Sequence, residues 1–318
     1  MKGWEYYGPN KPLKMVEKPD PVATEGRVVI DVKAAGLCHS DVGALRDEGW
    51  LELIEYTPII MGHEIAGVIT EVGEGVTDFK VGDRVGVCPV SKVGMGPGYG
   101  YDGGYATKVS APAVDLVRIP DNVPFEYAAV ATDAGMTSYH AMFVTGGAKP
   151  GMKVGVIGVG GLGQIAARAA VVKGCEVYAV DISPQARELA KSLGVKEVFE
   201  NVTDLKDLGL ELIVDYAGFG VTTAQAIEAV APGGKVVLVG MGKLESTINT
   251  RDLIVKSVTL AGSVGGTVED IAAVYELMAS GDIKPHVTKI GFDEIYDGLL
   301  RLERHEVKGR LVAMIDEE

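Results

Sequence analysis

A glycine-rich segment near the middle of the chain has the residue types that a bound phosphate requires. It reads Gly158-Val159-Gly160-Gly161-Leu162-Gly163, between an apolar stretch at 153–157 that predicts a buried strand and an alanine-rich stretch at 162–173 that predicts a helix. Glycines allow a tight turn, let a phosphate approach bare backbone, and let the helix pack closely on the strand. The amides at the start of such a helix face a bound anion. The segment therefore predicts a site for the pyrophosphate of a dinucleotide.

An acidic residue ends the next predicted strand, at 176–181. Asp181 follows the glycine segment by about 20 residues, where a carboxylate accepts hydrogen bonds from the ribose hydroxyls of the adenosine. The same carboxylate would repel a 2′-phosphate, and the next residues, Ile182 and Ser183, carry no positive charge. These features favour NAD over NADP. The alternative is that Asp181 only caps the helix that follows.

The composition is typical of a two-domain protein of the cytoplasm. With 318 residues, of which 47% are hydrophobic and 23% charged, the chain exceeds the size at which one core usually suffices. A net charge of −14 argues against a nucleic-acid or membrane partner. We find no secretory signal and no apolar stretch long enough to span a bilayer. The three cysteines, Cys38, Cys88 and Cys175, do not suggest a disulfide framework, and we expect the last two to pack in cores.

The pattern of predicted elements changes along the chain. Between about Gly26 and Pro120, short apolar runs at 27–33, 65–72 and 83–87 indicate a mostly antiparallel barrel. After Pro124, helical patterns alternate with buried strands, which indicates a doubly wound parallel sheet; these strands are 154–157, 177–180, 212–215, 235–239 and 259–261. A helix at 268–279 and a strand at 309–315 are expected to return to the first domain. We thus predict an α/β protein with a mostly antiparallel domain at 1–134 and 265–318 and a dinucleotide-binding domain at 135–264.

Several short motifs occur in a fixed order along the whole chain. They are Gly36-Leu-Cys38-His39-Ser40-Asp41, Gly62-His63-Glu64, Val81-Gly-Asp-Arg-Val85, Thr132-Asp133-Ala-Gly-Met-Thr137, the glycine segment and a terminal Gly309-Arg310-Leu-Val. In this order they resemble the zinc-dependent medium-chain dehydrogenase/reductase family, and in particular its NAD-dependent secondary-alcohol dehydrogenases. The resemblance implies a Rossmann fold for the parallel sheet, and it implies that the other domain is a GroES-like β-barrel and the catalytic domain.

The resemblance implies one catalytic zinc ion held by Cys38, His63 and Asp133. Catalytic zinc takes three protein ligands of these types and leaves a fourth position for water or substrate. Many relatives carry cysteine at the third position. An aspartate there, as at Asp133, resembles the pattern of the secondary-alcohol dehydrogenases and replaces a soft sulfur ligand by a harder oxygen ligand. Each residue also has an ordinary alternative: packing for Cys38, a core imidazole for His63 and a helix cap for Asp133.

The resemblance also gives roles to the neighbours of these ligands. Asp41 is expected to accept the second ring N–H of His63, unless it merely caps a turn. Ser40 is expected to relay the proton of the alcohol, because its hydroxyl can both accept and donate.

Four further residues belong to the same implied site. Glu64 is expected to pair with Arg310 or to approach the metal transiently. His39 is expected near the pyrophosphate of the cofactor, Thr137 near the nicotinamide, and Arg310 among the cofactor-binding residues.

The implied activity is hydride transfer between NAD and an alcohol/carbonyl pair, and Asp133 favours secondary alcohols and ketones. The proton of the alcohol is expected to leave through Ser40 and a ribose hydroxyl, in a cleft between the domains that excludes water. The alternatives are a polyol or sugar dehydrogenase, a zinc-free reductase of enones or quinones, and a non-catalytic dinucleotide sensor. The retained ligand set argues against the last two.

Two features of many relatives are missing from this sequence. Only Cys88 lies between Val87 and Tyr105, where many relatives have four cysteines, so no structural zinc is expected. Gly43 and Ala44 stand where many relatives have a relay histidine, so we expect the proton to leave without one.

The sequence says less about the substrate pocket and the assembly. Trp50 could line the substrate pocket. The glycine-rich stretch 94–104 is expected to be a surface loop, and Tyr99 or Tyr101 could also line the pocket if this loop folds over it. For each of these aromatic residues, an exposed or core position is the alternative. The segment 257–263 is predicted to be the edge strand of the parallel sheet, and such edges pair across a two-fold axis in this family. We therefore expect a homodimer or a homotetramer.

Overall fold

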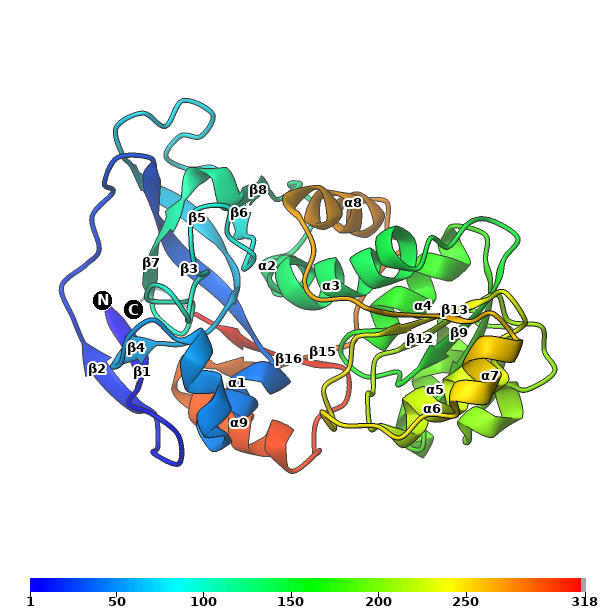
Figure 1. The fold of residues 1–318 in the computed structure, drawn as a ribbon. Helices are drawn as coiled ribbons and strands as arrows, with labels where there is room; N and C mark the ends of the chain where they lie inside the picture. The colour runs from blue at the N-terminus through cyan, green and yellow to red at the C-terminus, as the bar shows by residue number, and fades with distance from the viewer. Residues whose placement is uncertain (316–318) are drawn as a thin grey trace. The chain divides into compact units, whose positions relative to one another are not determined.

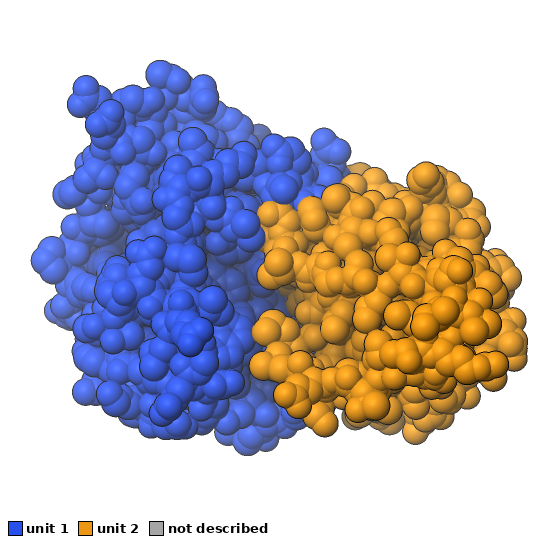
Figure 2. Space-filling model, in the orientation of Figure 1, with its two compact units in different colours: residues 1–133, 267–279, 286–318 blue, residues 134–266, 280–285 orange. Residues whose placement is uncertain are grey.

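The computed structural model describes residues 1–315, which form two compact units (Figures 1 and 2). Unit 1 contains residues 1–133, 267–279 and those from 286 onward, and unit 2 contains residues 134–266 and 280–285. The domain boundaries were expected after residues 134 and 264, and the structure has them after Asp133 and Gly266. The segment 280–285 was expected in the first domain but belongs to unit 2, because Arg168 Nε donates to the carbonyl of Asp282 at 2.7 Å and Ile283 is buried.

Unit 2 is built on one six-stranded parallel sheet with the order β11-β10-β9-β12-β13-β14. Two runs of strands that begin at the centre and proceed to opposite edges define a doubly wound sheet, as expected. The strands are β9 (Lys153–Ile157), β10 (Glu176–Val180), β11 (Glu197–Phe199), β12 (Leu212–Asp215), β13 (Lys235–Leu238) and β14 (Thr259–Gly262). The strand β14 lies at one edge of the sheet, where the sequence placed it.

Both faces of this sheet are buried, because successive side chains of its strands point to opposite sides. Val177 and Ala179 of β10 belong to one apolar cluster, whereas Tyr178 and Val180 belong to the other. The cluster of Val177 includes α4 and α5, and the cluster of Tyr178 includes α6. The helices are α3 (Met136–Tyr139), the π-helix η4 (His140–Thr145), α4 (Gly163–Val172), α5 (Pro184–Ser192), the 3-10 helix η5 (Val202–Leu205), α6 (Val221–Ala229) and α7 (Thr250–Val255).

Unit 1 contains a seven-stranded sheet whose long central strand is β3 (Arg27–Leu37). The strands pair antiparallel, except that β15 and β16 are parallel. The other members are β5 (Glu64–Val72), β6 (Arg84–Val87), β7 (Lys108–Pro112), β8 (Leu116–Arg118), β15 (Val287–Gly291) and β16 (Arg310–Met314). A smaller sheet joins β1 (Lys2–Tyr6), β2 (Lys14–Glu17) and β4 (Ile59–Ile60). The mostly antiparallel domain expected from the sequence is confirmed.

The helices of unit 1 come from both ends of the chain. They are α1 (His39–Arg46), the 3-10 helices η1 (Glu48–Leu53), η2 (Ala113–Asp115) and η6 (Phe292–Glu294), α2 (Phe125–Val130), α8 (Val268–Ala279) and α9 (Ile295–Glu303), with the π-helix η3 (Ala131–Gly135) at the boundary between the units. The helix at 268–279 and the final strand do return to unit 1, as expected.

The glycine-rich stretch 94–104 was expected to be a surface loop, but part of it is buried. Met95 is exposed, but Gly96, Pro97 and Gly98 are buried. They lie against backbone: a Cβ at Gly98 would lie 3.0 Å from the amide nitrogen of Gly62. The absence of side chains therefore lets this segment enter the unit instead of covering it.

None of the helices within residues 1–315 combines the length and the apolar character that crossing a membrane would require.

Candidate active site and metal centre

Strand register brings together two residues that are far apart in the sequence. Strands β3 and β5 are antiparallel, and Gly36 pairs with Glu64. Cys38 follows the end of β3, and His63 precedes the start of β5, so both side chains lie beyond the same end of this strand pair. Cys38 is also the residue that begins helix α1.

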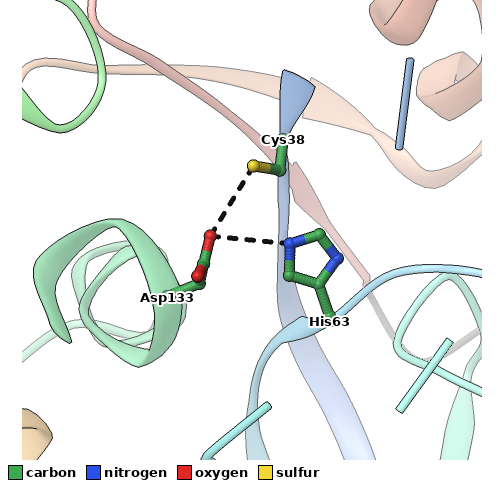
Figure 3. Close-up of side chains that lie close together, drawn as sticks. All are labelled: Cys38, His63 and Asp133. Atoms are coloured by element: carbon green, nitrogen blue, oxygen red, sulfur yellow. Dashed lines mark hydrogen bonds and ion pairs between the residues drawn. The ribbon is translucent and has the colours of Figure 1, made fainter. Parts of the chain in front are cut away.

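Asp133 completes a cluster with these two residues (Figure 3). Its Oδ2 atom lies 3.6 Å from Cys38 Sγ and 3.5 Å from His63 Nε2. Asp133 lies inside the π-helix η3 rather than at a helix end, so the alternative of a helix cap does not hold. A π-helical turn shifts the register of the side chains, and such turns are frequent at functional sites.

The distances from Asp133 to the other two donors fit a zinc ion, and all three donor atoms lie within 4.8 Å of one another. Bonds of about 2.0–2.3 Å at tetrahedral angles place a sulfur and an oxygen ligand about 3.6 Å apart and a nitrogen and an oxygen ligand about 3.4 Å apart. The observed distances are 3.6 Å and 3.5 Å. Among residues 1–315, sulfur, imidazole nitrogen and carboxylate oxygen thus converge within a space of the right size. Each of the three donors is of a type that zinc binds, and a catalytic zinc ion takes three protein ligands.

A buried carboxylate holds the other side of the His63 ring. Asp41 Oδ1 lies 3.3 Å from His63 Nδ1, and neither atom has a hydrogen-bond partner within the described chain. Asp41 Oδ2 accepts from the backbone amide of Cys38 at 3.0 Å and from the Tyr105 hydroxyl at 2.7 Å. Asp41 therefore links both expected ligands, and it leaves Nε2 as the ring nitrogen that faces Asp133.

The surroundings of His63 favour a positive charge. Burial lowers the pKa of His63, but the neighbouring Asp41 carboxylate and the contact with Asp133 raise it well above its ordinary value. A bound cation would take over the role of that proton, since ligation requires the neutral imidazole.

A buried ion pair borders the cluster. The register of β16 with β3 pairs Leu311 with Leu37, which places Arg310 beside Cys38. Arg310 donates to both carboxylate oxygens of Glu64, from Nε at 3.1 Å and from a terminal nitrogen, and that nitrogen lies 3.5 Å from Asp133 Oδ2. The expected pairing of Glu64 with Arg310 is confirmed. Burial raises the pKa of Glu64 to about 7, and the guanidinium of Arg310 opposes that rise.

Ser40 and Tyr99 lie against the imidazole of His63. Ser40 Oγ is 3.3 Å from His63 Nε2, and the centroid of the Tyr99 ring is 5.7 Å from that of His63. Burial raises the pKa of Tyr99 above its ordinary value, and the neighbouring His63 lowers it in part. The sequence offered Tyr99 as a pocket residue, with a core or exposed position as the alternative. The structure places it beside the expected metal ligands.

His39 is the first residue of helix α1, and Trp50 lies in the 3-10 helix η1 that follows it. A Cβ at Gly43 would lie 2.6 Å from the Trp50 indole, so Trp50 covers the α1 backbone where many relatives have the relay histidine. His39 stacks with His305 at a centroid distance of 6.1 Å. The pocket role of Trp50 and the cofactor roles of His39 and Arg310 stay predictions, as does that of Thr137, which lies buried in α3 of unit 2.

The segment between β6 and Tyr105 is held by a buried carboxylate. Asp115 accepts from the Ser91 hydroxyl at 2.5 Å and from the amide of Lys92 at 3.1 Å, and its carbonyl accepts from the amide of Cys88 at 2.8 Å. No sequence pattern indicated this role of Asp115. We call residues 88–105 the Asp115-anchored segment.

In unit 2 the glycine segment forms the turn from β9 into α4. Gly158 has a φ of +85°, which disfavours other residues, and a Cβ at Gly163 would collide with the carbonyl of Gly158. By contrast, a Cβ at Gly160 would meet nothing within 4 Å, so the backbone is open there. Leu162 begins helix α4. The turn therefore presents bare backbone and the N-terminus of a helix to the same space.

Asp181 follows β10 and is tied to this turn. Its Oδ2 accepts from the amide of Val159 at 2.8 Å, and its Oδ1 accepts from the amide of Ser183 at 2.8 Å. Ser183, not Asp181, begins helix α5 and accepts from the amide of Ala186. The alternative of a helix-capping Asp181 is therefore wrong. The nearby Arg187 is bound to backbone carbonyls and to Glu200.

A buried carboxylate in unit 2 was not predicted from the sequence. Asp215 at the end of β12 accepts from the amides of Ala217 and Gly218 and from the hydroxyls of Thr222 and Thr223, at distances of 2.7–3.0 Å. It fixes the loop between β12 and α6. That loop contacts the glycine turn, because a Cβ at Gly158 would lie 3.1 Å from the Ala217 side chain.

Comparison with known proteins agrees with this geometry. Residues 24–121 match the family model of the alcohol dehydrogenase GroES-like domain, and residues 161–280 match that of the zinc-binding dehydrogenases. An alcohol dehydrogenase of Geobacillus stearothermophilus is 36% identical over 96% of this chain and 97% of its own.

Two solved structures extend the likeness to the whole fold. Acetophenone reductase from Geotrichum candidum, in complex with NAD, is 30% identical with a TM-score of 0.90 over 98% of this chain and 96% of its own. The 2R,3R-butanediol dehydrogenase of Bacillus subtilis is 26% identical with a TM-score of 0.88 over 99% of each chain. The chain belongs to the zinc-type medium-chain alcohol dehydrogenase family and is an NAD-dependent alcohol oxidoreductase.

Proposed function

We propose that this enzyme interconverts small or medium secondary alcohols and their ketones, using one zinc ion per subunit. The observation that carries the proposal is the donor cluster of Cys38, His63 and Asp133, whose spacing matches a tetrahedral zinc site. An aspartate instead of a cysteine at the third ligand position, here Asp133, resembles the ligand pattern of secondary-alcohol dehydrogenases. The reductase of acetophenone, a ketone, and the butanediol dehydrogenase also act on carbonyl or carbinol groups within a carbon chain.

The residues of unit 1 would hold the metal and move the proton. Cys38, His63 and Asp133 would bind zinc, and Asp41 would keep the proton on His63 Nδ1 so that Nε2 remains a ligand. Ser40 Oγ would accept the proton of the alcohol. When bound, zinc supplies a Lewis acid that lowers the pKa of the alcohol, and NAD supplies the hydride acceptor.

The residues of unit 2 would hold the dinucleotide. The open backbone at Gly160 and the start of α4 would bind the pyrophosphate, with Gly161 in the same turn. Asp181, which the amide of Val159 already orients, would accept from the ribose hydroxyls.

The test is NAD reduction across matched alcohols that differ only in the position of the hydroxyl, before and after a chelator. We expect turnover of secondary alcohols above that of their primary isomers, loss of turnover after chelation, and recovery when zinc is added back. A clear preference for primary alcohols would contradict the substrate class, whereas full activity in a metal-free preparation would contradict the metal.

We further propose that zinc is bound at one site per subunit. The sequence has three cysteines, and the Sγ of Cys88 is buried and donates to the carbonyl of Val90 at 3.5 Å. Elemental analysis is expected to find about one zinc per chain.

The assembly is proposed to be a dimer formed through β14, or a tetramer built from two such dimers. Leu260 of this edge strand and Ile254 and Val255 of α7 are exposed apolar side chains of unit 2. Light scattering that gave the mass of one chain would contradict this assembly. A cytoplasmic location is proposed as well, because all three cysteines are free thiols.

A further inference from the structure

Tyr105 is a fully buried residue of unit 1 that contacts Asp41, the expected partner of His63. Its hydroxyl donates to Asp41 Oδ2 at 2.7 Å, whereas the carbonyl oxygen of Gly36 lies farther from it, at 3.4 Å. A tyrosine hydroxyl has one proton to donate, and the shorter contact is with the carboxylate, which is the stronger acceptor. The hydrogen bond of Tyr105 is therefore made to Asp41.

The backbone and the ring of Tyr105 are both held in place. Its amide donates to the carbonyl of Met61 at 2.9 Å, and its carbonyl accepts from the amide of Trp4 at 2.8 Å. Its ring packs against Gly62, where an added Cβ would lie 2.5 Å from the tyrosine Cδ1 atom. Because Gly62 directly precedes His63, Tyr105 contacts both the backbone that leads to this expected ligand and the carboxylate beside its ring.

The two oxygens of the Asp41 carboxylate have different surroundings. Oδ2 accepts from the Tyr105 hydroxyl and from the backbone amide of Cys38, at 2.7 Å and 3.0 Å. Oδ1 faces Nδ1 of the His63 ring at 3.3 Å. The bond from the Cys38 amide is local, because it belongs to the start of helix α1. Of the two donors to Oδ2, Tyr105 is the one that comes from a distant segment, so it fixes the carboxylate to the rest of the unit.

We propose that Tyr105 is a positioning residue of the metal centre, whose hydroxyl holds Oδ2 of Asp41 and thereby keeps Oδ1 directed at His63 Nδ1. The inference rests on the proposed roles of His63 as a zinc ligand and of Asp41 as its partner. A carboxylate can rotate about its bond to Cβ unless its surroundings fix it. With Oδ2 fixed, His63 keeps its proton on Nδ1 and offers the lone pair of Nε2 to zinc.

The test is Tyr105→Phe, which keeps the ring against Gly62 and removes the hydroxyl. Groups that orient a ligating histidine typically contribute about 10–100-fold to metal affinity. We expect zinc affinity to fall by about 10-fold, at the low end of this range, because the amide of Cys38 still holds the carboxylate of Asp41. Zinc is titrated into the metal-free protein in competition with a chelator, at a temperature well below the Tm of every variant. An unchanged or higher affinity would overturn the proposal.

Tyr6→Phe is the matched control, because it removes another buried hydroxyl that bonds helix α1. The Tyr6 hydroxyl donates to the carbonyl of Ala44 at 2.7 Å, and Tyr6 is as buried as Tyr105. We expect both variants to lower Tm, since each loses a buried hydrogen bond, but the zinc affinity of Tyr6→Phe should stay within about 2-fold of that of the unmodified protein. Equal losses of zinc affinity would overturn the proposal, since the effect would then come from the packing of α1.

A double-mutant cycle with Asp41→Ala shows whether Tyr105 acts through Asp41. If it does, Tyr105→Phe lowers zinc affinity further by less than about 2-fold once the carboxylate is gone. Full additivity of the two losses would overturn the proposal. If Asp41→Ala does not fold, the comparison of Tyr105→Phe with Tyr6→Phe decides.

Failure of the proposed function would give a different result. An unmodified protein that binds no zinc contradicts the metal site itself. An unmodified protein that binds zinc no more tightly than Tyr105→Phe contradicts the role of Tyr105 alone.

Discussion

The metal cluster of unit 1 and the glycine turn of unit 2 differ in which part of the chain makes the contacts. In unit 1 the donors are side chains from residues 38, 63 and 133, brought together by strand register and a π-helix. In unit 2 the turn 158–163 offers mainly backbone, and one carboxylate, Asp181, is added from the next strand. A site of side chains is destroyed by truncating one of them, whereas a site of backbone tolerates such changes and is sensitive to added atoms.

The largest effect is therefore expected at a metal ligand. Asp133→Ala removes one of the three expected zinc ligands. It also removes the carboxylate that lies 3.5 Å from the buried guanidinium of Arg310. We expect bound zinc to be lost and kcat/KM to fall by at least about 1000-fold, the loss of several kcal/mol of Lewis-acid stabilisation. Metal analysis and NAD reduction measure both.

Asp121→Ala, a change at an exposed aspartate of the same unit, is the control and should leave both unchanged. Full activity of Asp133→Ala with zinc still bound would refute the ligand assignment and remove the contrast between the two sites.

An intermediate effect is expected from Asp41→Asn, which keeps the shape of the side chain but removes its charge beside His63. Partners of ligating histidines typically contribute 10–100-fold to metal affinity. We expect zinc affinity to fall by about that factor, measured by competition with a chelator. Asp31→Asn, at a surface pair with Lys108, should not change it. Equal affinities would mean that Asp41 acts only on helix α1.

A smaller effect is expected from Asp181→Ala in unit 2. The backbone amides remain, so we expect the KM for NAD to rise by about 10-fold, the loss of hydrogen bonds to a charged group, while kcat is largely kept. Steady-state kinetics with varied NAD measure this. Asp204→Ala, an exposed aspartate of unit 2, is the control. A collapse of kcat as large as that of Asp133→Ala would show that the two sites do not differ as we describe.

The smallest effect is expected from Ser183→Ala, which removes the side chain that begins helix α5. Loss of such a cap costs about 1 kcal/mol of stability. Thermal unfolding should show the lower stability, with the KM for NAD unchanged. A raised KM would mean that Ser183, not Asp181 alone, contacts the cofactor.

The same difference explains what could be predicted from the sequence. The glycine turn is contiguous, and its flanking strand and helix have regular apolar patterns, so its strand, turn and helix are found almost at their predicted bounds. Cys38, His63 and Asp133 have no periodic spacing, and only the resemblance to a family grouped them.

The residues that support these sites could not be predicted, because their partners are set by tertiary packing. Tyr105 donates to Asp41 across 64 positions of sequence, and Asp115 holds Ser91 across 24. The position of Tyr99 beside His63 could not be predicted either, because nothing in a glycine-rich run indicates where its tyrosine side chains lie. Buried glycines at 96 and 98 let this run pass inside the unit.

The anchoring of residues 88–105 by Asp115 has a consequence for how the enzyme withstands its surroundings. The Asp115 carboxylate accepts hydrogen bonds from a hydroxyl and a backbone amide. Unlike thiolates that bind a structural metal ion, it is not oxidised, and a chelator has no ion to remove from it. Removal of zinc should therefore abolish activity while the Asp115-anchored segment keeps its structure. Adding one zinc ion per chain should then restore the enzyme.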